Sequence, residues 1–347
     1  MTSGNFKTSY EKDGAIFQTY FVKIWLAVFL VFLFIIPFLV DPYFVSLLNF
    51  CGIAVIGALG LNILTGSTGL ISLAQATFIA FGAYSTAILS VRVGLPFWIV
   101  MPASGIITAV AGLIIGIPTL KLKGLYFAVA TMGFAFIVSH IIENYQSLTG
   151  GTDGMEVGAI SIGTFEVSSD IQFYFLILII AIGSTLFTRN LFRTRVGRAF
   201  TAIRDRDIAA EIIGIDLTKY KLISFMISSF LTGIAGSLYA YYMRFIGPDH
   251  FTLSVSIQYL AMIIIGGMGT VLGSIYGAVF MTLIPEVLRL LVDVMSATLP
   301  MLKTRFVDLK DIVYGFIIVG FLLFEPDGFY GRWITIKTYW KMWPYTY

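Results

Sequence analysis

The feature that most constrains this chain is a long segment without a single charged side chain, which runs from Pro42 to Val91. A transmembrane α-helix needs about 20 consecutive, mostly apolar residues, so this segment is long enough for two of them. In a water-soluble fold, a run of this length would leave a large apolar patch facing solvent. The segment therefore predicts an integral membrane protein.

The composition of the whole chain agrees with this prediction. Of its 347 residues, 58% are hydrophobic and 12% are charged, and the mean hydropathy is +0.91. Soluble domains carry roughly 25% charged residues. A net charge of +3 gives no reason to expect a nucleic-acid partner. The single cysteine, Cys51, cannot form a disulfide within the chain.

Apolar runs along the rest of the chain predict an all-α fold, a polytopic bundle of transmembrane helices. We expect about ten spans, with about eight or nine as the alternative. Two spans would divide the uncharged segment at Gly66–Gly69, and two more would divide Val255–Leu288 at Gly266–Gly269. The other expected spans are Ile24–Val40, Phe97–Thr119, Gly124–His140, Ile171–Phe187, Leu222–Met243 and Ile312–Phe324.

The loops differ strongly in charge, and this difference predicts their orientation. The segment Thr188–Lys221 holds eight lysines and arginines, whereas Ile141–Asp170 holds five acidic residues and no base. Because cytoplasmic loops are enriched in Lys and Arg, we expect the first inside and the second outside. Alternation then places both termini in the cytoplasm. We expect a cytoplasmic segment at 1–23, a transmembrane domain at 24–325, and a tail at 326–347 along the inner membrane surface.

Motifs for catalysis or nucleotide binding are missing from the sequence. It contains no GxxxxGK[ST], HExxH or GxSxG, and no cluster of cysteines and histidines with metal-ligand spacing. We therefore expect no catalytic site, no metal and no cofactor bound by this chain, and no ATP bound by it.

Two glycine-rich segments interrupt the apolar runs, one in each half of the chain. Backbone polar groups at membrane depth must be buried in protein or line a wet cavity, and paired interrupted spans often mark a translocation pathway. Close helix packing explains the same residues equally well, so both interpretations stay open. The candidate pathway residues are Asn62, Thr65, Gly66, Ser67, Thr68 and Gln75 in the first segment, and Gly266, Gly267 and Gly269 in the second.

One acidic residue, Glu286, lies within an expected span. An acid at membrane depth is a functional candidate by default. However, Arg289 follows one helical turn later, and we favour a structural ion pair between the two. A proton- or sodium-coupled secondary transporter usually needs several such groups, so that alternative is less well supported.

The basic loop contains an amphipathic pattern. Its apolar residues recur at helical spacing, and Gly214 is expected to end the helix. We expect this helix against the inner membrane face, where it could dock a partner that supplies energy. The apolar positions are Val196, Phe200, Ile203, Ala210 and Ile213.

Several colinear stretches resemble one family, the permease subunits of branched-chain amino acid ABC importers, and especially their LivM-like member. These stretches are GLNILTGSTGLISLAQATFIAFGAYSTAIL at 60–89, LKGLYFAVATMGFAFI at 122–137, TGGTDG at 149–154, RTRVGRAFTAIRDRDIAAEIIGID at 193–216, IGGMGTVLGSIYGA at 265–278 and FEPDGFYG at 324–331.

The resemblance implies the substrate class and the partners. It implies a multi-pass protein of the bacterial inner membrane that works with a second homologous permease, a pair of ATP-binding cassette subunits and an extracytoplasmic substrate-binding protein. A permease for urea or short amides is the alternative within the same family. The implied ATPase-coupling residues lie in the basic loop: Arg198, Ala209, Ala210, Glu211 and Gly214.

Overall fold

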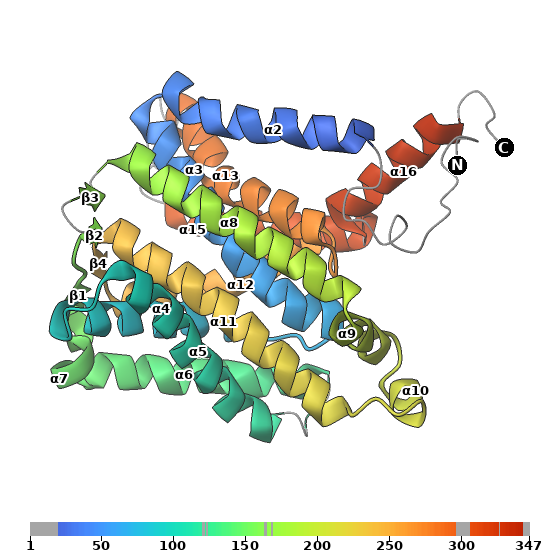
Figure 1. The fold of residues 1–347 in the computed structure, drawn as a ribbon, viewed down its shortest axis with the longest axis horizontal. Helices are drawn as coiled ribbons and strands as arrows, with labels where there is room; N and C mark the ends of the chain where they lie inside the picture. Colours follow the sequence, from blue (N-terminus) through green and yellow to red (C-terminus); the bar gives the residue numbers. More distant parts are fainter. Residues whose placement is uncertain are drawn as a thin grey trace.

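The computed structural model describes residues 20–119, 122, 124–162, 165–167, 169–295, 306–325 and 327–342, and these residues form a bundle of long helices (Figure 1). The expected all-α, polytopic fold is confirmed. The expected cytoplasmic segment at 1–23 lies mostly outside the described residues, as do 343–347 of the tail.

Within the described residues, seven helices are long and apolar enough to cross a membrane, or eight if the bent pair α15 (Phe306–Phe324) and α16 (Gly328–Met342) counts as one span. The predicted count of about ten is thus not confirmed. The seven are Pro42–Gly66 (α3 with the π-helical turn η1), Phe97–Thr119 (α5), Leu125–Asn144 (α6), Asp170–Arg193 (α8), Leu217–Met243 (α11), Pro248–Gly266 (η4 with α12) and Val271–Leu290 of α13.

The difference between this number and the predicted count comes from three helices that are too short or too polar to qualify as spans on their own. In α2 (Tyr20–Leu39), the apolar part, Lys23–Leu39, is shorter than a full span. The helix α4 (Gln75–Ala87) continues through η2 (Ile88–Arg92), but its first half carries many polar and small residues. The third is α15, which passes as a span only when it is joined to α16.

The core of the bundle is formed by α3 and α11. In the most apolar 18-residue stretch of each helix, 67% is buried, against 28% in the corresponding stretch of α6. A helix that is apolar on all sides is one that packs in the interior, and α3 is buried almost continuously from Ile53 to Gly66. In contrast, α6 exposes Leu125, Tyr126 and Phe136, as expected for a helix that faces lipid.

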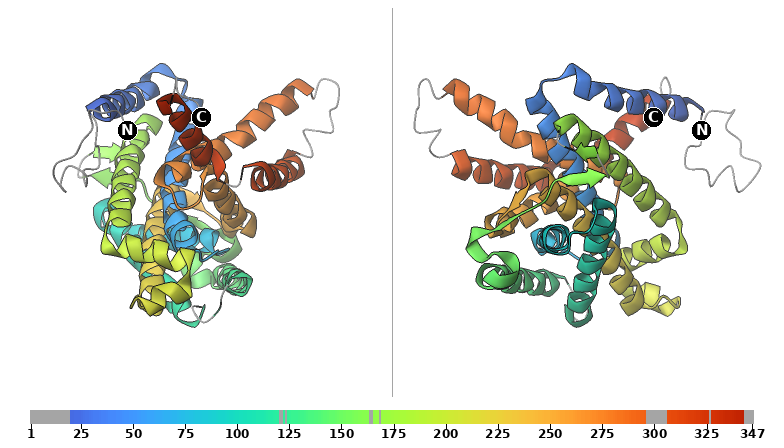
Figure 2. Two further views of the ribbon diagram at one scale, coloured as in Figure 1. Left: turned by 90° about the vertical axis from the view of Figure 1, so that its right-hand side faces the viewer. Right: turned by 60° about the vertical axis from the view of Figure 1, so that its left-hand side comes forward.

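The acidic and basic loops lie at opposite ends of the bundle (Figures 1 and 2). At one end, β1 (Met155–Glu156) pairs with β4 (Phe245–Ile246), and β2 (Ile160–Ile162) pairs with β3 (Phe165–Val167), both antiparallel. The short helices α7 (Gln146–Thr149), η3 (Gly151–Asp153) and η4 (Pro248–Phe251) complete this end. We call it the strand end.

At the other end lie the two short helices of the basic loop, α9 (Arg195–Asp205) and α10 (Asp207–Ile212). The sequence pattern predicts one helix here, and this is wrong, because Arg206 has extended backbone angles (φ −155°, ψ 102°) and separates the two. The beginning of α2 and the helix α16 lie toward this same end in Figure 1. We call it the loop end.

Candidate functional site

The two interrupted segments meet at the loop end of the bundle, although they are far apart in the sequence. The Asn62 side chain of the first segment makes two hydrogen bonds to the second. Its Nδ2 donates to the carbonyl oxygen of Thr270 (3.1 Å), and its Oδ1 accepts from the backbone N–H of Gly269 (2.8 Å). Asn62 is fully buried. A buried amide that satisfies two backbone groups is costly to remove, so it fixes the two segments to each other.

Glycine is required on both sides of this contact. A Cβ at Gly66 would overlap the Asn62 side chain and the backbone nitrogen of Gly269. Gly269 itself has a backbone φ of +81°, an angle that residues other than glycine rarely adopt. We call the region formed by Asn62, Gly66, Met268, Gly269 and Thr270 the junction.

A third element, α9, reaches the junction through Arg204. Its Nη1 donates to the carbonyl oxygen of Gly66 (2.7 Å) and approaches that of Met268 (3.5 Å). Arg204 was not predicted as a site residue and was only one of the eight bases in the loop. A signal was present, because Arg204 follows the buried Phe200 by four residues and so shares its face of the helix.

The hydroxyl groups of the first interrupted segment hold that segment together. Each donates to a carbonyl of the same segment: Thr65 to Leu70 (3.0 Å), Ser67 to Asn62 (3.3 Å) and Thr68 to Leu64 (2.6 Å). All three side chains are buried. Their contacts account for the packing interpretation, and their role in a pathway stays a prediction.

After Thr68 the chain leaves the helix and re-enters the bundle as non-helical backbone up to Ala74. A hydroxyl of a neighbouring helix satisfies one of its amides, because Leu73 N–H donates to Thr131 Oγ1 of α6 (3.0 Å). At the start of α4, Ala76 N–H donates to Ser256 Oγ of α12 (2.9 Å). This agrees with the rule that irregular backbone at membrane depth must find partners in the protein.

Gln75 lies apart from the junction, at the start of α4. Its Nε2 donates to the carbonyl oxygen of Gly57 (2.9 Å) and to Thr232 Oγ1 (3.1 Å), so it joins α4 to both core helices. Gly57 is five positions before Asn62 on the same spanning stretch. Gln75 therefore lies deeper in the bundle than Asn62 does, by about 8 Å at 1.5 Å per residue.

The remaining pathway candidates are Gly266, the last residue of α12, and Gly267, the first residue of the turn to α13. A Cβ on Gly266 would overlap the backbone of Gly273, and a Cβ on Gly267 would crowd the carbonyl oxygen of Asp327 at 2.9 Å. These glycines allow three stretches of backbone to pack directly on one another.

The predicted coupling residues are spread along α9 and α10. Ala210 is buried (1%) against the bundle, whereas Ala209 and Glu211 are exposed on α10. Gly214 ends the helix as predicted, with a φ of +89° and open space around it. Arg198 is exposed on α9 and donates to the carbonyl oxygen of Arg193 (3.1 Å).

An exposed apolar face on α10 was not predicted. Ile208, Ile212 and Ile213 are 67%, 80% and 73% exposed, so Ile213 does not share the buried face of Phe200 and Ile203. The extended Arg206 changes the phase of the helix, which turns Ile213 outward while Phe200 and Ile203 stay buried. Three large apolar side chains at the tip of a charged loop are typical of a docking surface.

The expected ion pair of Glu286 is confirmed. Its carboxylate lies 3.9 Å from Arg289 Nη1, and it also accepts a hydrogen bond from the hydroxyl of Tyr43 on α3. Arg289 in turn donates to the Tyr43 hydroxyl (3.0 Å). The acid is therefore part of a small network that joins α13 to α3.

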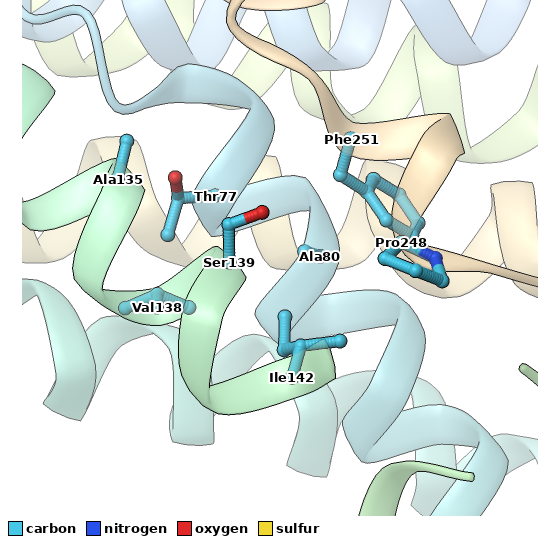
Figure 3. A pocket seen from close by; sticks show the side chains of 8 residues that line it. All are labelled: Thr77, Ala80, Ala135, Val138, Ser139, Ile142, Pro248 and Phe251. Carbon is cyan, nitrogen blue, oxygen red and sulfur yellow. The ribbon is translucent and has the colours of Figure 1, made fainter. Parts of the chain in front are cut away.

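A pocket lies between α4, α6 and η4, toward the strand end (Figure 3). Its walls are mostly apolar, and Thr77 and Ser139 contribute hydroxyls. The enclosed space is about that of one water molecule, which is far smaller than an amino acid. The pathway candidates of the sequence analysis do not line it.

Comparison with known proteins gives a consistent result. Residues 43–322 match the family described as "Branched-chain amino acid transport system / permease component". The chain is 33% identical over 291 residues to the high-affinity branched-chain amino acid transport system permease protein LivM of Salmonella typhimurium and to that of Escherichia coli. In both cases 77% of this chain and 68% of the relative are covered.

More distant relatives include a probable branched-chain amino acid transport permease protein LivH of Methanocaldococcus jannaschii. It is 24% identical over 239 residues, which cover 66% of this chain and 74% of the relative. No solved structure matches the chain significantly.

Proposed function

The chain belongs to the family of branched-chain amino acid transport permease components, and from this premise we propose how it receives energy and passes its substrate. It is a multi-pass membrane protein and the permease subunit of a branched-chain amino acid ABC importer. The observation that carries the proposal is the exposed apolar face of α10, at the end of a loop whose other helix, α9, contacts the junction.

The ATP-binding subunits dock on α10. Ile208, Ile212 and Ile213 supply apolar contact area, and Glu211 between them can accept charge-assisted hydrogen bonds from the partner. Gly214 and the buried Ala210 set the angle at which this helix leaves the bundle. Arg198 and Ala209 complete the coupling surface predicted from the sequence.

The complete importer contains this chain, a second homologous permease, a pair of ATPase subunits and an extracytoplasmic binding protein. The ATPases bind and hydrolyse ATP, and this chain carries no catalytic group or cofactor of its own. Substrate passes near the junction and the re-entrant segment, where Asn62, Gly66 and Gln75 lie. The chain resides in the bacterial inner membrane.

The loop end is cytoplasmic, and both termini lie there. The eight bases of the loop support this orientation, as does the placement of the five-acid loop at the opposite end. Counting α2, α4 and α15 as additional membrane segments gives about ten crossings and lets every loop alternate. The permease domain then covers 24–325, and the tail 326–347 lies along the inner surface.

We expect cysteine labelling to confirm this orientation. In a Cys51→Ser background, Asp153→Cys should react with a membrane-impermeant maleimide added outside, and Arg198→Cys should react only after the membrane is opened. Both side chains are exposed, so each site can be reached. Labelling of position 153 only from the cytoplasmic side would contradict the topology.

Reconstitution tests the function itself. The chain, co-expressed with the permease, ATPases and binding protein of its operon and placed in proteoliposomes, should accumulate L-leucine when ATP is supplied to the ATPase side. Urea and acetamide, offered through the same binding protein, should not be taken up. Uptake driven by a proton or sodium gradient without ATP would overturn the proposal.

The Glu286 network gives a second means of separating ATP-driven from ion-coupled transport. The Arg289 side chain is 57% exposed and the Glu286 side chain 19% exposed, and a pair with one exposed partner contributes about 1 kcal/mol or less. Glu286→Gln should therefore change leucine uptake by less than about threefold and leave its pH profile unchanged. A loss of about a hundredfold with a shifted pH profile would instead identify Glu286 as a proton relay.

A further inference from the structure

Arg204 lies where the carboxyl ends of two membrane helices converge. The stretch α3–η1 ends at Gly66, and α12 ends at Gly266, just before Met268. The last carbonyls of a helix have no partner within it, and they carry the negative end of the helix dipole. The guanidinium of Arg204 donates to the carbonyl oxygen of Gly66, at the end of η1, and approaches that of Met268, in the turn that follows α12, so one cation contacts both segments.

The rest of α9 is anchored beside the same place. Phe200, one turn before Arg204, is fully buried in a cluster with Ile63 of η1 and Leu231 of α11. The aliphatic part of Arg204 packs near Gly69, where a Cβ would lie 3.7 Å from its Cγ. On the other side, a Cβ at Gly269 would overlap the guanidinium. Arg204 is exposed on the surface of the loop end, and its side chain lies directly against two glycines.

We propose that Arg204 is the positioning residue that transmits movement of the coupling loop to the junction. When an ATPase displaces α10, α9 moves with it, and the Arg204 bonds apply that movement to the ends of α3–η1 and α12 together. Asn62 already fixes these two ends to each other, so they respond as one unit. This inference rests on the proposed function and adds the residue through which coupling passes.

Arginine is suited to this task, and lysine is less so. The guanidinium presents several donors in a fixed plane and can reach two carbonyls at once, whereas an ammonium acts as a compact point charge. The positive charge alone retains part of the interaction with the helix ends. Arg204→Lys should therefore be intermediate between the wild type and Arg204→Gln.

The test uses the whole complex in lipid nanodiscs and proteoliposomes, with binding protein loaded with L-leucine. For Arg204→Gln we expect normal assembly, basal ATP hydrolysis within about twofold of wild type, and at least tenfold less leucine transported per ATP hydrolysed. Arg204→Lys should recover part of that ratio. Arg195→Gln, an exposed arginine of the same helix, removes the same charge and should leave the ratio unchanged.

Two results would overturn the inference. One is an unchanged ratio of leucine to ATP in Arg204→Gln. The other is a parallel fall of basal hydrolysis, stimulated hydrolysis and thermal stability with no recovery in Arg204→Lys, because that pattern marks a residue needed only for folding. If the wild-type complex itself shows no leucine-dependent hydrolysis, the proposed function fails instead, and the two failures are thus distinguishable.

Discussion

Replacing Gly66 with leucine is expected to reduce leucine uptake at least tenfold while the protein still inserts and assembles. The new side chain would enter the space held by Asn62 and the backbone of Gly269. Overpacking of this kind costs about 1–3 kcal/mol. Displacing Asn62 adds about 1–3 kcal/mol for each backbone group left buried without its partner. The junction would open locally, because the long helices that end there keep their own packing.

The matched control is Gly133→Leu. Gly133 is exposed on α6, and a Cβ there meets nothing within 4 Å. Uptake and amount of protein should both stay near wild type. Uptake, membrane content and co-purification of the ATPase should be measured side by side for both variants. If Gly66→Leu transports normally at normal protein levels, the junction takes no part in transport and is not tightly packed in the membrane.

Replacing Ile212 with aspartate is expected to release the ATPase from the permease. Ile212 is the most exposed of the three apolar side chains on the docking surface. Burying an isoleucine contributes about 1.5–3 kcal/mol, and an aspartate buried in its place would have to lose its hydration without a matching partner. We expect association weakened by at least thirtyfold in a pull-down or by surface plasmon resonance, with uptake lost in parallel.

Thr218→Asp provides the control for added charge in the same loop. Thr218 is exposed in the first turn of α11, where an acid is favourable to the helix dipole. It should bind the ATPase as the wild type does. Glu211→Arg reverses a charge within the docking surface, and its affinity for the ATPase should lie between those of Thr218→Asp and Ile212→Asp. Normal binding by Ile212→Asp would show that the ATPase docks elsewhere.

Sequence alone predicted the helical class, most of the spans and both glycine-rich interruptions, because those follow from hydropathy over long windows. The predicted count of about ten spans is not confirmed, because seven or eight helices of the described residues are long and apolar enough. The stretch Gln75–Arg92 starts with buried polar residues that bind neighbouring helices, and an average over hydropathy cannot separate such a helix from a loop. Whether this stretch forms a buried helix depends on the neighbouring helices that cover it and bind its polar groups.

The loop was predicted in outline and wrong in detail for a similar reason. Of the apolar positions that recur at helical spacing, Phe200, Ile203 and Ala210 are buried. One residue with extended backbone angles, Arg206, divides the helix and turns the isoleucines that follow toward solvent. The spacing of Arg204 from Phe200 could have placed it on the buried face of the helix, but its partners could not be predicted, since they are backbone carbonyls that come from two distant parts of the chain.

The packing of α12 on α13 has a consequence for how the bundle can change shape. At Gly266, Gly273 and Gly277 the two backbones touch with no side chain between them, and Gly277 faces the carbonyl oxygen of Met262. The two helices cannot slide along each other without losing these backbone contacts. We therefore expect α12 and α13 to move together as one rigid unit. The turn Gly267–Gly269, where Gly267 and Gly269 have positive φ, closes this helical hairpin and moves with it. Any alternation of access must then move the hairpin as a whole against the helices around it.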